Sequence, residues 1–262
     1  MCARTASKAE NAIKKIKTVV PDANITHLPL DLMSFESIKE AAYEFTKNES
    51  RLDILVNNAG IMAGPPVRSK EGYEGQFGTN HLGHFLLTKL LLPTMLKTVE
   101  QPDADVRVVN VASAAYTGAP SAGLILDQDK LCEQLTWTRY CHSKLANILF
   151  AREFAKRYPS ITSVAIHPGM IFTNIWTVGA EGNVFVRLAT NLVVRFIEMG
   201  VEDGTKNQLW AATAAKGKDG VLSGKYYDPV GKINSGSRAA RDNKLAEKLW
   251  DWSEEELKKH GC

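Results

Sequence analysis

Short runs of apolar residues alternate with longer amphipathic segments along most of the chain, and this alternation restricts the folds that are open to it. The runs at 25–30, 52–56, 106–112 and 161–166 have the length of strands, and the segments between them space their apolar residues as helices do. Parallel strands need such long connections, whereas antiparallel neighbours can be joined by a short hairpin. The sequence therefore predicts an α/β fold, with a doubly wound parallel sheet between two layers of helices.

The same spacing gives the expected helices. Ser34 has the side chain of a helix N-cap, so a helix is expected to follow it. Further helices are expected directly after residue 5, at 71–98, from the segment of Tyr140 to about residue 158, at 202–216 and at 243–259, with another short strand at 224–227. A chain of 262 residues has the size of one domain, and residues 1–262 are expected to form it.

Composition and charge argue against several classes of protein. Hydrophobic residues at 44% and charged residues at 23% are ordinary for a globular protein. The net charge of +3 is spread along the chain without a basic block, which argues against a nucleic-acid partner. No run approaches the roughly 18 apolar residues of a transmembrane segment, and the four cysteines form no CxxC pair. We therefore expect a protein of a reducing compartment, the cytoplasm, without a transmembrane segment.

Tyr140 and Lys144 are the first candidates for chemistry. Because they are four residues apart on a predicted helix, they project from the same face. A neighbouring cation favours the phenolate, so the pKa of Tyr140 is expected to fall from about 10 toward working pH, where a proton donor or acceptor is most useful. Tyr43 and Lys47 have the same spacing, so spacing alone does not separate a catalytic pair from a surface pair.

The position of each pair along its helix separates the two. In sheets of this kind ligands bind beyond the carboxyl ends of the strands. Tyr140 and Lys144 lie near the start of a helix that follows a strand, at that edge. Tyr43 and Lys47 lie near the end of a helix that leads into a strand, at the opposite edge. We therefore interpret Tyr43 and Lys47 as solvated surface and keep Tyr140 and Lys144 as the candidate site.

Other polar residues follow predicted strands at the same edge, namely Asp31, Asn57, Ser113 and Pro168–Gly169. Ser113 could hydrogen-bond a substrate oxygen, and the small residues after Asn57 would let a flat ligand approach closely. Asn80, on the long helix, could hold a water that links Lys144 to solvent. Each of these residues alone could equally be a turn or surface residue, but together they converge on one edge.

Four separated motifs follow one another along the chain: residues 57–60 (Asn-Asn-Ala-Gly), Asn80 within 79–85, Ser113 with Tyr140 to Lys144, and Pro168–Gly169. Together they resemble the short-chain dehydrogenase/reductase family. Residues 143–150 and 224–227 are similar to the branch of that family that contains retinol dehydrogenases and their fungal relatives. The resemblance runs from Cys2 to about the C-terminus and implies a Rossmann-like fold.

The resemblance implies hydride transfer between a nicotinamide and a carbonyl carbon. Tyr140 would be the acid/base, Lys144 the cation that lowers its pKa and holds the ribose, and Ser113 the residue that orients the carbonyl. Asn80 would keep the water of a proton relay. Besides Tyr140 and Lys144, the residues implied to contact the cofactor include Asn58, Ala59, Gly60, Pro168, Gly169 and Thr173.

Arg4 and the pair Asp31–Leu32 bear on the choice of cofactor. In related enzymes a basic residue closes the second strand, in a context like Cys2-Ala3-Arg4, and meets the 2′-phosphate of NADP. A guanidinium suits a phosphate because it forms bidentate, charge-assisted hydrogen bonds. Asp31 and Leu32 resemble the pair that contacts the adenine. We therefore predict NADP(H) in preference to NAD(H), which stays open as a second cofactor.

The chain departs from the family pattern at its beginning. The family pattern opens with a strand, a glycine-rich turn and a helix that receives the pyrophosphate, but this sequence contains no GxxxGxG or GxGxxG. Residues 1–4 resemble the end of the second strand, so a βαβ unit of about 30 residues is expected to be absent and the fold to be N-terminally truncated. Two interpretations stay open: a fragment of an active enzyme, or a shortened, cofactor-impaired protein with a binding or regulatory role.

Residues 171–200 are rich in large apolar side chains. They could form a lid over the substrate or a helix packed on the core. As a lid they would indicate a lipophilic alcohol, aldehyde or ketone as substrate; retinoid-like and steroid-like compounds are suggested by the family alone. Peripheral membrane association and a homo-oligomer stay open. No metal is expected, because His81 and His84 have no carboxylate or cysteine at ligand spacing.

Overall fold

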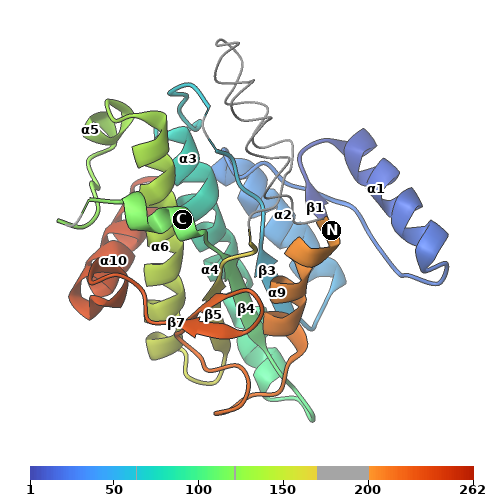
Figure 1. Ribbon diagram of the computed structural model, residues 1–262. Coiled ribbons are helices and arrows are strands. Elements are labelled where there is room, and N and C mark those ends of the chain that lie inside the picture. Colours follow the sequence, from blue (N-terminus) through green and yellow to red (C-terminus); the bar gives the residue numbers. More distant parts are fainter. Residues whose placement is uncertain (63, 121, 170–200) are drawn as a thin grey trace, which may run out of the picture.

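The computed structural model describes residues 1–62, 64–120, 122–169 and 201–262 (Figure 1). The main sheet has the strand order β3-β4-β5-β6-β7, in which the first four strands are parallel and β7 is antiparallel to β6. These strands are β3 (Ile54–Asn57), β4 (Arg107–Val111), β5 (Thr162–Ile166), β6 (Tyr226–Asp228) and β7 (Lys232–Asn234). A separate parallel pair joins β1 (Cys2–Ala3) to β2 (Leu28–Pro29).

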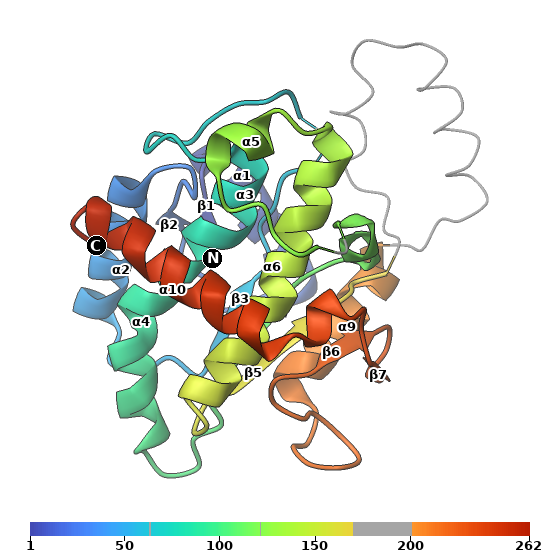
Figure 2. The same cartoon turned by 90° about the vertical axis from the view of Figure 1, so that its left-hand side faces the viewer.

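Helices cover both faces of the main sheet. The α-helices of the described residues are α1 (Ala6–Val19), α2 (Phe35–Asn48), α3 (Gly75–Phe77), α4 (Gly83–Val99), α5 (Gln128–Cys132), α6 (Thr136–Arg157), α9 (Val201–Thr213) and α10 (Asn243–Lys259). Of these, α1 packs on β1 of the separate pair. On one face α2 packs on α4 and α10 crosses α6, whereas α9 packs on the other face against β3, β4 and β5 (Figures 1 and 2). This is the predicted three-layer, Rossmann-like α/β fold, with one antiparallel strand at its edge.

Two hydrophobic cores lie on the two faces of the sheet. The larger one fills the space between the sheet and α2, α4, α6 and α10. The smaller one joins Val109, Val164 and their neighbours to Ala211 of α9. Because side chains alternate along a strand, β4 and β5 contribute to both cores, and every residue of these two strands is buried.

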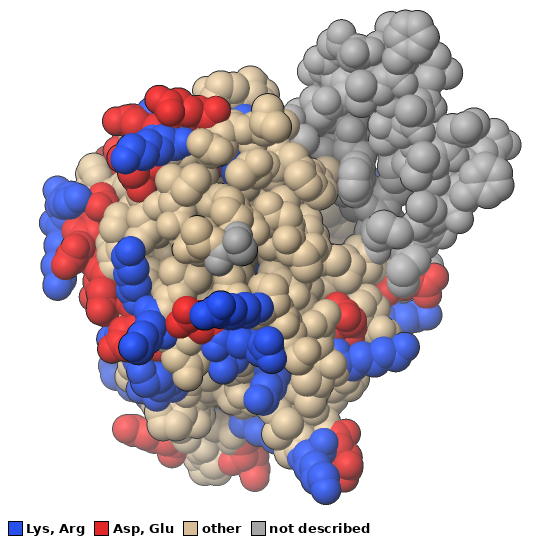
Figure 3. Space-filling model, turned by 60° about the vertical axis from the view of Figure 1, so that its left-hand side comes forward, with Lys and Arg blue, Asp and Glu red and all other residues tan. Residues whose placement is uncertain are grey.

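Charged side chains stay on the surface of these layers for the most part. On the face shown in Figure 3, basic and acidic side chains are intermixed rather than gathered by sign. This mixture matches a net charge of only +3 that is spread along the sequence. Large fields of one charge are therefore not a feature of that face.

Most of the predicted elements are confirmed. The first and last helices lie where apolar spacing places them, and Ser34 caps α2 by accepting a hydrogen bond from the Ser37 N–H at 3.3 Å. The strand expected at 25–30 is reduced to Leu28–Pro29, because its partner β1 is only two residues long. The short elements α5 and β7 were not expected.

The helix expected at 71–98 is wrong in its first part. The helical segment begins at Gly75 and passes through a π-helical turn, Gly78–Leu82, before it continues as α4. A π turn inserts an extra residue into the helical ladder, and such turns are frequent at functional sites. Asn80 lies in the middle of this turn.

The strand expected at 52–56 is not buried as predicted. Ile54 and Val56 of β3 are 40% and 39% exposed. β3 pairs with β4 on one side, and none of the strands within the described ranges pairs with its other side. A strand with one neighbour leaves its second edge and part of its face open, which is why apolar residues that read as buried reach solvent here.

Ser34→Ala is expected to destabilise the fold, because α2 loses its N-cap. Loss of such a cap costs about 1 kcal/mol, which corresponds to about 2–4 °C in the melting temperature of a chain of this size. Thr5, at the N-cap of α1, makes no side-chain hydrogen bond, so Thr5→Ala is the matched control. Thermal unfolding followed by circular dichroism measures both variants, and equal shifts would contradict a specific role for Ser34.

Candidate active site

Tyr140 and Lys144 lie on one face of α6, at the carboxyl end of β4. Both side chains are buried, with Tyr140 7% and Lys144 4% exposed. The Lys144 ammonium donates a hydrogen bond to the Val111 carbonyl, with 2.9 Å from Nζ to O, and lies 5.6 Å from the centre of the Tyr140 ring. Asn147 donates to the same carbonyl at 3.1 Å. The last residue of β4 therefore holds two side chains of α6 at this edge of the sheet.

The expected fall in the pKa of Tyr140 is wrong for this structure. Burial raises the pKa of Tyr140 to about 12, and a hydrogen bond with Ser113 opposes this shift only in part. Burial also lowers the pKa of Lys144 to about 8. Both shifts have one cause, because removing a group from water disfavours its charged form. The Lys144 ammonium is directed at the Val111 carbonyl, so its charge does not outweigh the burial of the phenol.

Tyr43 and Lys47, the pair with the same spacing, lie on the surface. Tyr43 is 68% exposed on α2, and Lys47 is exposed near the end of that helix. The interpretation of this pair as solvated surface is confirmed. Tyr43 therefore provides a matched control for experiments on Tyr140.

Asn80 holds protein backbone in this structure. Its side-chain N–H groups donate to the Ser143 hydroxyl at 2.9 Å and to the Ile61 carbonyl at 3.0 Å, and its Oδ1 accepts from the Ile61 N–H at 2.9 Å. Asn80 thus binds both backbone groups of Ile61, as a neighbouring strand would. It ties the loop after β3 to α6 through Ser143.

Gly60 lies where that loop comes closest to the candidate pair. A Cβ atom on Gly60 would lie 3.1 Å from the Asn80 Oδ1 and 3.6 Å from the Lys144 Nζ. The first distance is tighter than ordinary van der Waals contact, so a side chain at this position would push the Asn80 amide by a few tenths of an ångström. Asn58 and Ala59, just before it, are exposed, and the Asn58 Oδ1 accepts a hydrogen bond from Gln208 at 2.8 Å.

Ser113 caps the 3₁₀ turn Ala114–Gly118 directly after β4. Its Oγ accepts a hydrogen bond from the Ala115 N–H at 3.2 Å, and its hydrogen bond with Tyr140 lowers the pKa of that phenol. Ser113 is half-buried, whereas Tyr140 is buried. The two hydroxyls are therefore brought together by the end of a strand and the first turns of a helix.

The loop after β5 reaches the same edge. Asn207 of α9 donates to the carbonyls of His167 and Tyr227, at 2.7 and 3.2 Å, and so fixes the start of this loop. Gly169 has φ +96°, a conformation that glycine adopts at no steric cost. Thr173, which was expected to contact the cofactor, lies outside the described residues, as does the whole of the expected lid at 171–200.

The residues expected at the adenosine end of the cofactor follow β1 and β2. Arg4 is exposed directly after β1. Asp31 is half-buried, and its Oδ1 accepts a hydrogen bond from the Met33 N–H at 3.0 Å. The side chain of Leu32 packs into the larger core. The backbone of Leu32 lies just beyond the end of β2.

Two histidines near the site belong to the core. His81 Nε2 lies 3.0 Å from the Ser253 hydroxyl, and His84 Nδ1 lies 3.0 Å from the Asn80 carbonyl oxygen. Burial lowers the pKa of His81 to about 3 and that of His84 to about 4, so both are neutral near pH 7. In the described ranges no cluster of three or more histidine, cysteine or acidic side chains could hold a metal ion.

Sequence reasoning missed polar groups close to the candidate site. Arg139 and Glu74 form a buried ion pair with 3.2 Å between Nη1 and Oε1. The sequence signal that could have revealed the pair was the charge of Arg139, which directly precedes Tyr140 on a helix predicted to pack on the core. Tyr226 was also missed: its ring contacts that of Tyr116, and its buried hydroxyl has no hydrogen-bond partner among the described residues.

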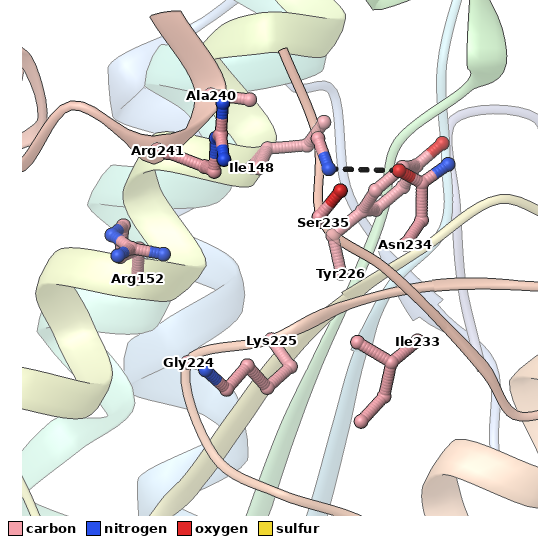
Figure 4. A pocket seen from close by; sticks show the side chains of 11 residues that line it. Ile148, Arg152, Gly224, Lys225, Tyr226, Ile233, Asn234, Ser235, Ala240 and Arg241 are labelled. Atoms are coloured by element: carbon pink, nitrogen blue, oxygen red, sulfur yellow. Dashed lines mark hydrogen bonds between the residues drawn. The ribbon is translucent and has the colours of Figure 1, made fainter. Parts of the chain in front are cut away.

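A separate pocket of about 210 Å³ lies beside α6 (Figure 4). Ile148 and Arg152 form one wall, and they continue the helical stripe of Tyr140 and Lys144 by one and two turns. The other walls come from residues 224–226, 233–236 and 240–241. Tyr140 and Lys144 do not line this pocket, so it is distinct from the candidate active site.

Known proteins resemble this chain over nearly its whole length. The family model for short chain dehydrogenases matches residues 1–125. The chain is 38% identical to the short-chain dehydrogenase/reductase drtF of Aspergillus calidoustus, over 99% of this chain and 85% of the relative. It is 37% identical to human retinol dehydrogenase 12, over 95% of this chain and 75% of the relative.

The chain belongs to the short-chain dehydrogenase/reductase family. It is therefore an oxidoreductase of the class that acts on CH–OH groups with NAD(P)(H). A crystal structure of an uncharacterized protein from Mycobacterium paratuberculosis matches with a TM-score of 0.72 at 29% identity, over 98% of this chain and 83% of the other. NADPH-bound carbonyl reductase from chicken fatty liver has the same fold, with a TM-score of 0.60 at 22% identity over 90% and 86% of the two chains.

Among the residues that the structure describes, no helix of this short-chain dehydrogenase/reductase combines the length and the apolar character needed to cross a bilayer.

Lys144→Met is expected to stabilise the fold near pH 7. With a folded-state pKa of about 8, against 10.5 for an ordinary lysine, burial of the ammonium costs about 3 kcal/mol while Lys144 is charged in both folded and unfolded chains. Between pH 8 and 10.5 the folded chain loses a proton that the unfolded chain keeps, so stability rises and the penalty disappears. The melting temperature of Lys144→Met should exceed that of the wild type at pH 7, by about 6 °C or more.

The pH dependence of this difference is the test. The gap between Lys144→Met and the wild type should shrink from pH 8 to pH 10.5 in thermal unfolding. Lys47→Met, at the exposed position with the same helical spacing, should show no such trend. A gap that stays constant over this pH range would contradict the burial of a charged Lys144.

Proposed function

We propose that this enzyme uses NADP(H) to interconvert a lipophilic alcohol and its aldehyde or ketone, with Tyr140 as the acid/base. The observation that carries the proposal is the convergence of Tyr140, Ser113 and Lys144 at the carboxyl edge of the sheet, where the Ser113 and Tyr140 hydroxyls are hydrogen-bonded. We also take residues 1–262 as a single domain, which the shared core of α2, α4, α6 and α10 supports.

Tyr140 would move the proton of the reaction. In the direction of reduction its phenol donates a proton to the carbonyl oxygen of the substrate, and in the direction of oxidation the phenolate takes it back. A bound nicotinamide supplies or accepts the hydride. A pKa of about 12 keeps Tyr140 protonated near neutral pH, which suits a proton donor. Ser113 would donate a hydrogen bond to the same oxygen and orient it.

Lys144 would act on Tyr140 and on the cofactor together. Its ammonium lies beside the phenol ring and stabilises the phenolate that forms when the proton leaves. The close approach of Gly60 to Lys144 leaves backbone, rather than a side chain, next to the ammonium. These residues fit the ribose and nicotinamide end of a dinucleotide, because a flat ring needs such a wall and ribose hydroxyls need such a donor. Asn80 would keep this wall in place.

Arg4 would decide between NADP(H) and NAD(H). It is exposed at the carboxyl end of β1, and a guanidinium there suits a 2′-phosphate. Asp31 and the backbone at Leu32 would lie at the adenine end, and Asn58, Ala59, Pro168, Gly169 and Thr173 would line the remainder.

The substrate would be lipophilic. Support comes from the apolar sequence of residues 171–200 and from relatives such as retinol dehydrogenase 12, whose name states its alcohol. A long-chain aldehyde such as decanal is a suitable probe, because it presents one carbonyl on an apolar body. NADPH and decanal are therefore the reactants in the experiments on Tyr140 and on Arg139.

Tyr140→Phe is expected to lower kcat for decanal by about 10²- to 10⁴-fold, the usual contribution of a general acid. The fold should persist, since the ring and its contacts remain. Tyr43→Phe, on the exposed pair with the same spacing, should leave kcat unchanged. Steady-state oxidation of NADPH measures both, and a Tyr140→Phe variant with wild-type kcat would exclude Tyr140 as the acid.

Arg4→Ala is expected to weaken NADP(H) binding and to leave NAD(H) binding unchanged. A hydrogen bond to a charged group is worth about 1.5–3 kcal/mol, or roughly 10- to 100-fold in Kd. Arg51→Ala is the control, because Arg51 pairs with Asp53 at the amino end of β3. Calorimetric titration with each dinucleotide measures Kd, and unchanged NADP(H) affinity in Arg4→Ala, with NAD(H) preferred, would refute the assignment.

A further inference from the structure

Arg139 and Glu74 are a pair of charges that the fold removes almost completely from water. Their side chains are 3% and 1% exposed, and 3.2 Å separates Nη1 from Oε1. Arg139 directly precedes Tyr140 on α6, so the two side chains leave the helix about 100° apart, one toward α3 and one toward the site. Burying an ion pair is a poor way to gain stability, because desolvation offsets the attraction. Its other contacts indicate what the pair does.

The second terminal nitrogen of the Arg139 guanidinium, Nη2, binds the loop after β3. It donates to the Gly64 carbonyl at 3.1 Å, and the Thr136 hydroxyl donates to the same carbonyl at 2.9 Å. Gln76 in turn donates to the carbonyl and the hydroxyl of Thr136, at 3.0 and 3.2 Å. The Gly64 carbonyl is therefore bound by two donors from the first turn of α6.

Glu74 joins this contact to the turn that carries Asn80. Its Oε2 accepts a hydrogen bond from the Phe77 N–H at 2.8 Å and caps α3, which continues into the π turn of Asn80. Asn80 binds both backbone groups of Ile61. The loop from Ile61 to Gly64 is thus held at both ends, by Asn80 at one and by Arg139 with Thr136 at the other.

This loop begins beside the reacting groups. Gly60 directly precedes Ile61, and its Cβ position lies 3.6 Å from the Lys144 ammonium. A shift of the loop would move the wall next to Lys144, and misplacement by about 1 Å can cost 10²-fold in rate. We propose that Arg139, paired with Glu74, is a positioning residue for the reaction: it fixes residues 60–62 and 64 against Lys144 and Tyr140. This role rests on the proposed function.

Arg139→Lys is the informative substitution. It keeps a positive charge for Glu74 but removes the second terminal nitrogen that reaches Gly64, since an ammonium cannot span two acceptors as a guanidinium does. Arg107→Lys is the matched control. Arg107 is equally buried at 3%, bonds to Asp105 and to the carbonyls of Ala211 and Ala214, and lies at the opposite end of β4.

Two measurements decide the proposal. Hydrogen exchange of the backbone amides of residues 60–62 and 64 should become at least about tenfold faster in Arg139→Lys and stay unchanged in Arg107→Lys. With decanal and NADPH, kcat should fall about 10- to 100-fold in Arg139→Lys, with KM for decanal within about threefold of the wild type. Arg107→Lys should keep the kcat of the wild type even if it loses as much melting temperature as Arg139→Lys.

Unchanged exchange at residues 60–62 and 64 would overturn the proposal, and so would a loss of kcat that Arg107→Lys reproduces at the same loss of melting temperature. Failure of the proposed function is detected separately, because Tyr140→Phe would then keep the kcat of the wild type. If the wild type does not turn over decanal, exchange at residues 60–62 and 64 alone decides whether Arg139 positions the loop.

Discussion

The burial of α6 is the constraint on which the candidate site depends. This helix lies between the sheet, the π turn and α10, and most of its residues from Arg139 onward are buried. Water is therefore kept from Tyr140 and Lys144 together, and both pKa values move toward the neutral forms. The ammonium remains in this environment because the Val111 carbonyl accepts its hydrogen bond. The burial of α6 therefore both shifts the two pKa values and imposes the free-energy cost of a buried ammonium.

Beyond the ends of several strands, side chains form the hydrogen bonds with the backbone that a neighbouring strand would otherwise form. Backbone groups beyond the last ladder hydrogen bond need other partners when they are buried. Asn80 supplies them for Ile61, and Asn207 does so for His167 and Tyr227. Amide side chains suit this task because they carry a donor and an acceptor, as a peptide group does. The loops that line the carboxyl edge are fixed in this way without adding strands.

Local pattern was enough to predict much of the fold. The spacing of apolar residues located α6 and α10, and the order of strands and helices put Tyr140 and Lys144 at the carboxyl edge and Tyr43 at the other. The π turn around Asn80 escaped prediction, because its apolar residues have nearly the spacing of an α-helix. Its effect on geometry is local, but it decides where the amide of Asn80 points.

Properties that depend on distant partners could not be predicted. The pKa of Tyr140 is set by burial among elements far apart in sequence, which a neighbouring lysine does not reveal. The pairing of Arg139 with Glu74 joins residues 65 positions apart. The exposure of Ile54 and Val56 depends on which strands flank β3, whereas their apolar character is compatible with a central or an edge strand.

The open side of β3 has a consequence for the behaviour of the protein in solution. Within the described ranges, β3 pairs with a strand on one side only and carries two β-branched, partly exposed side chains, so its second edge is a template on which another chain can add a strand. The rate of such addition rises with the square of protein concentration, so it competes with folding at high expression and is negligible at high dilution. A well-packed interior gives no protection against this association.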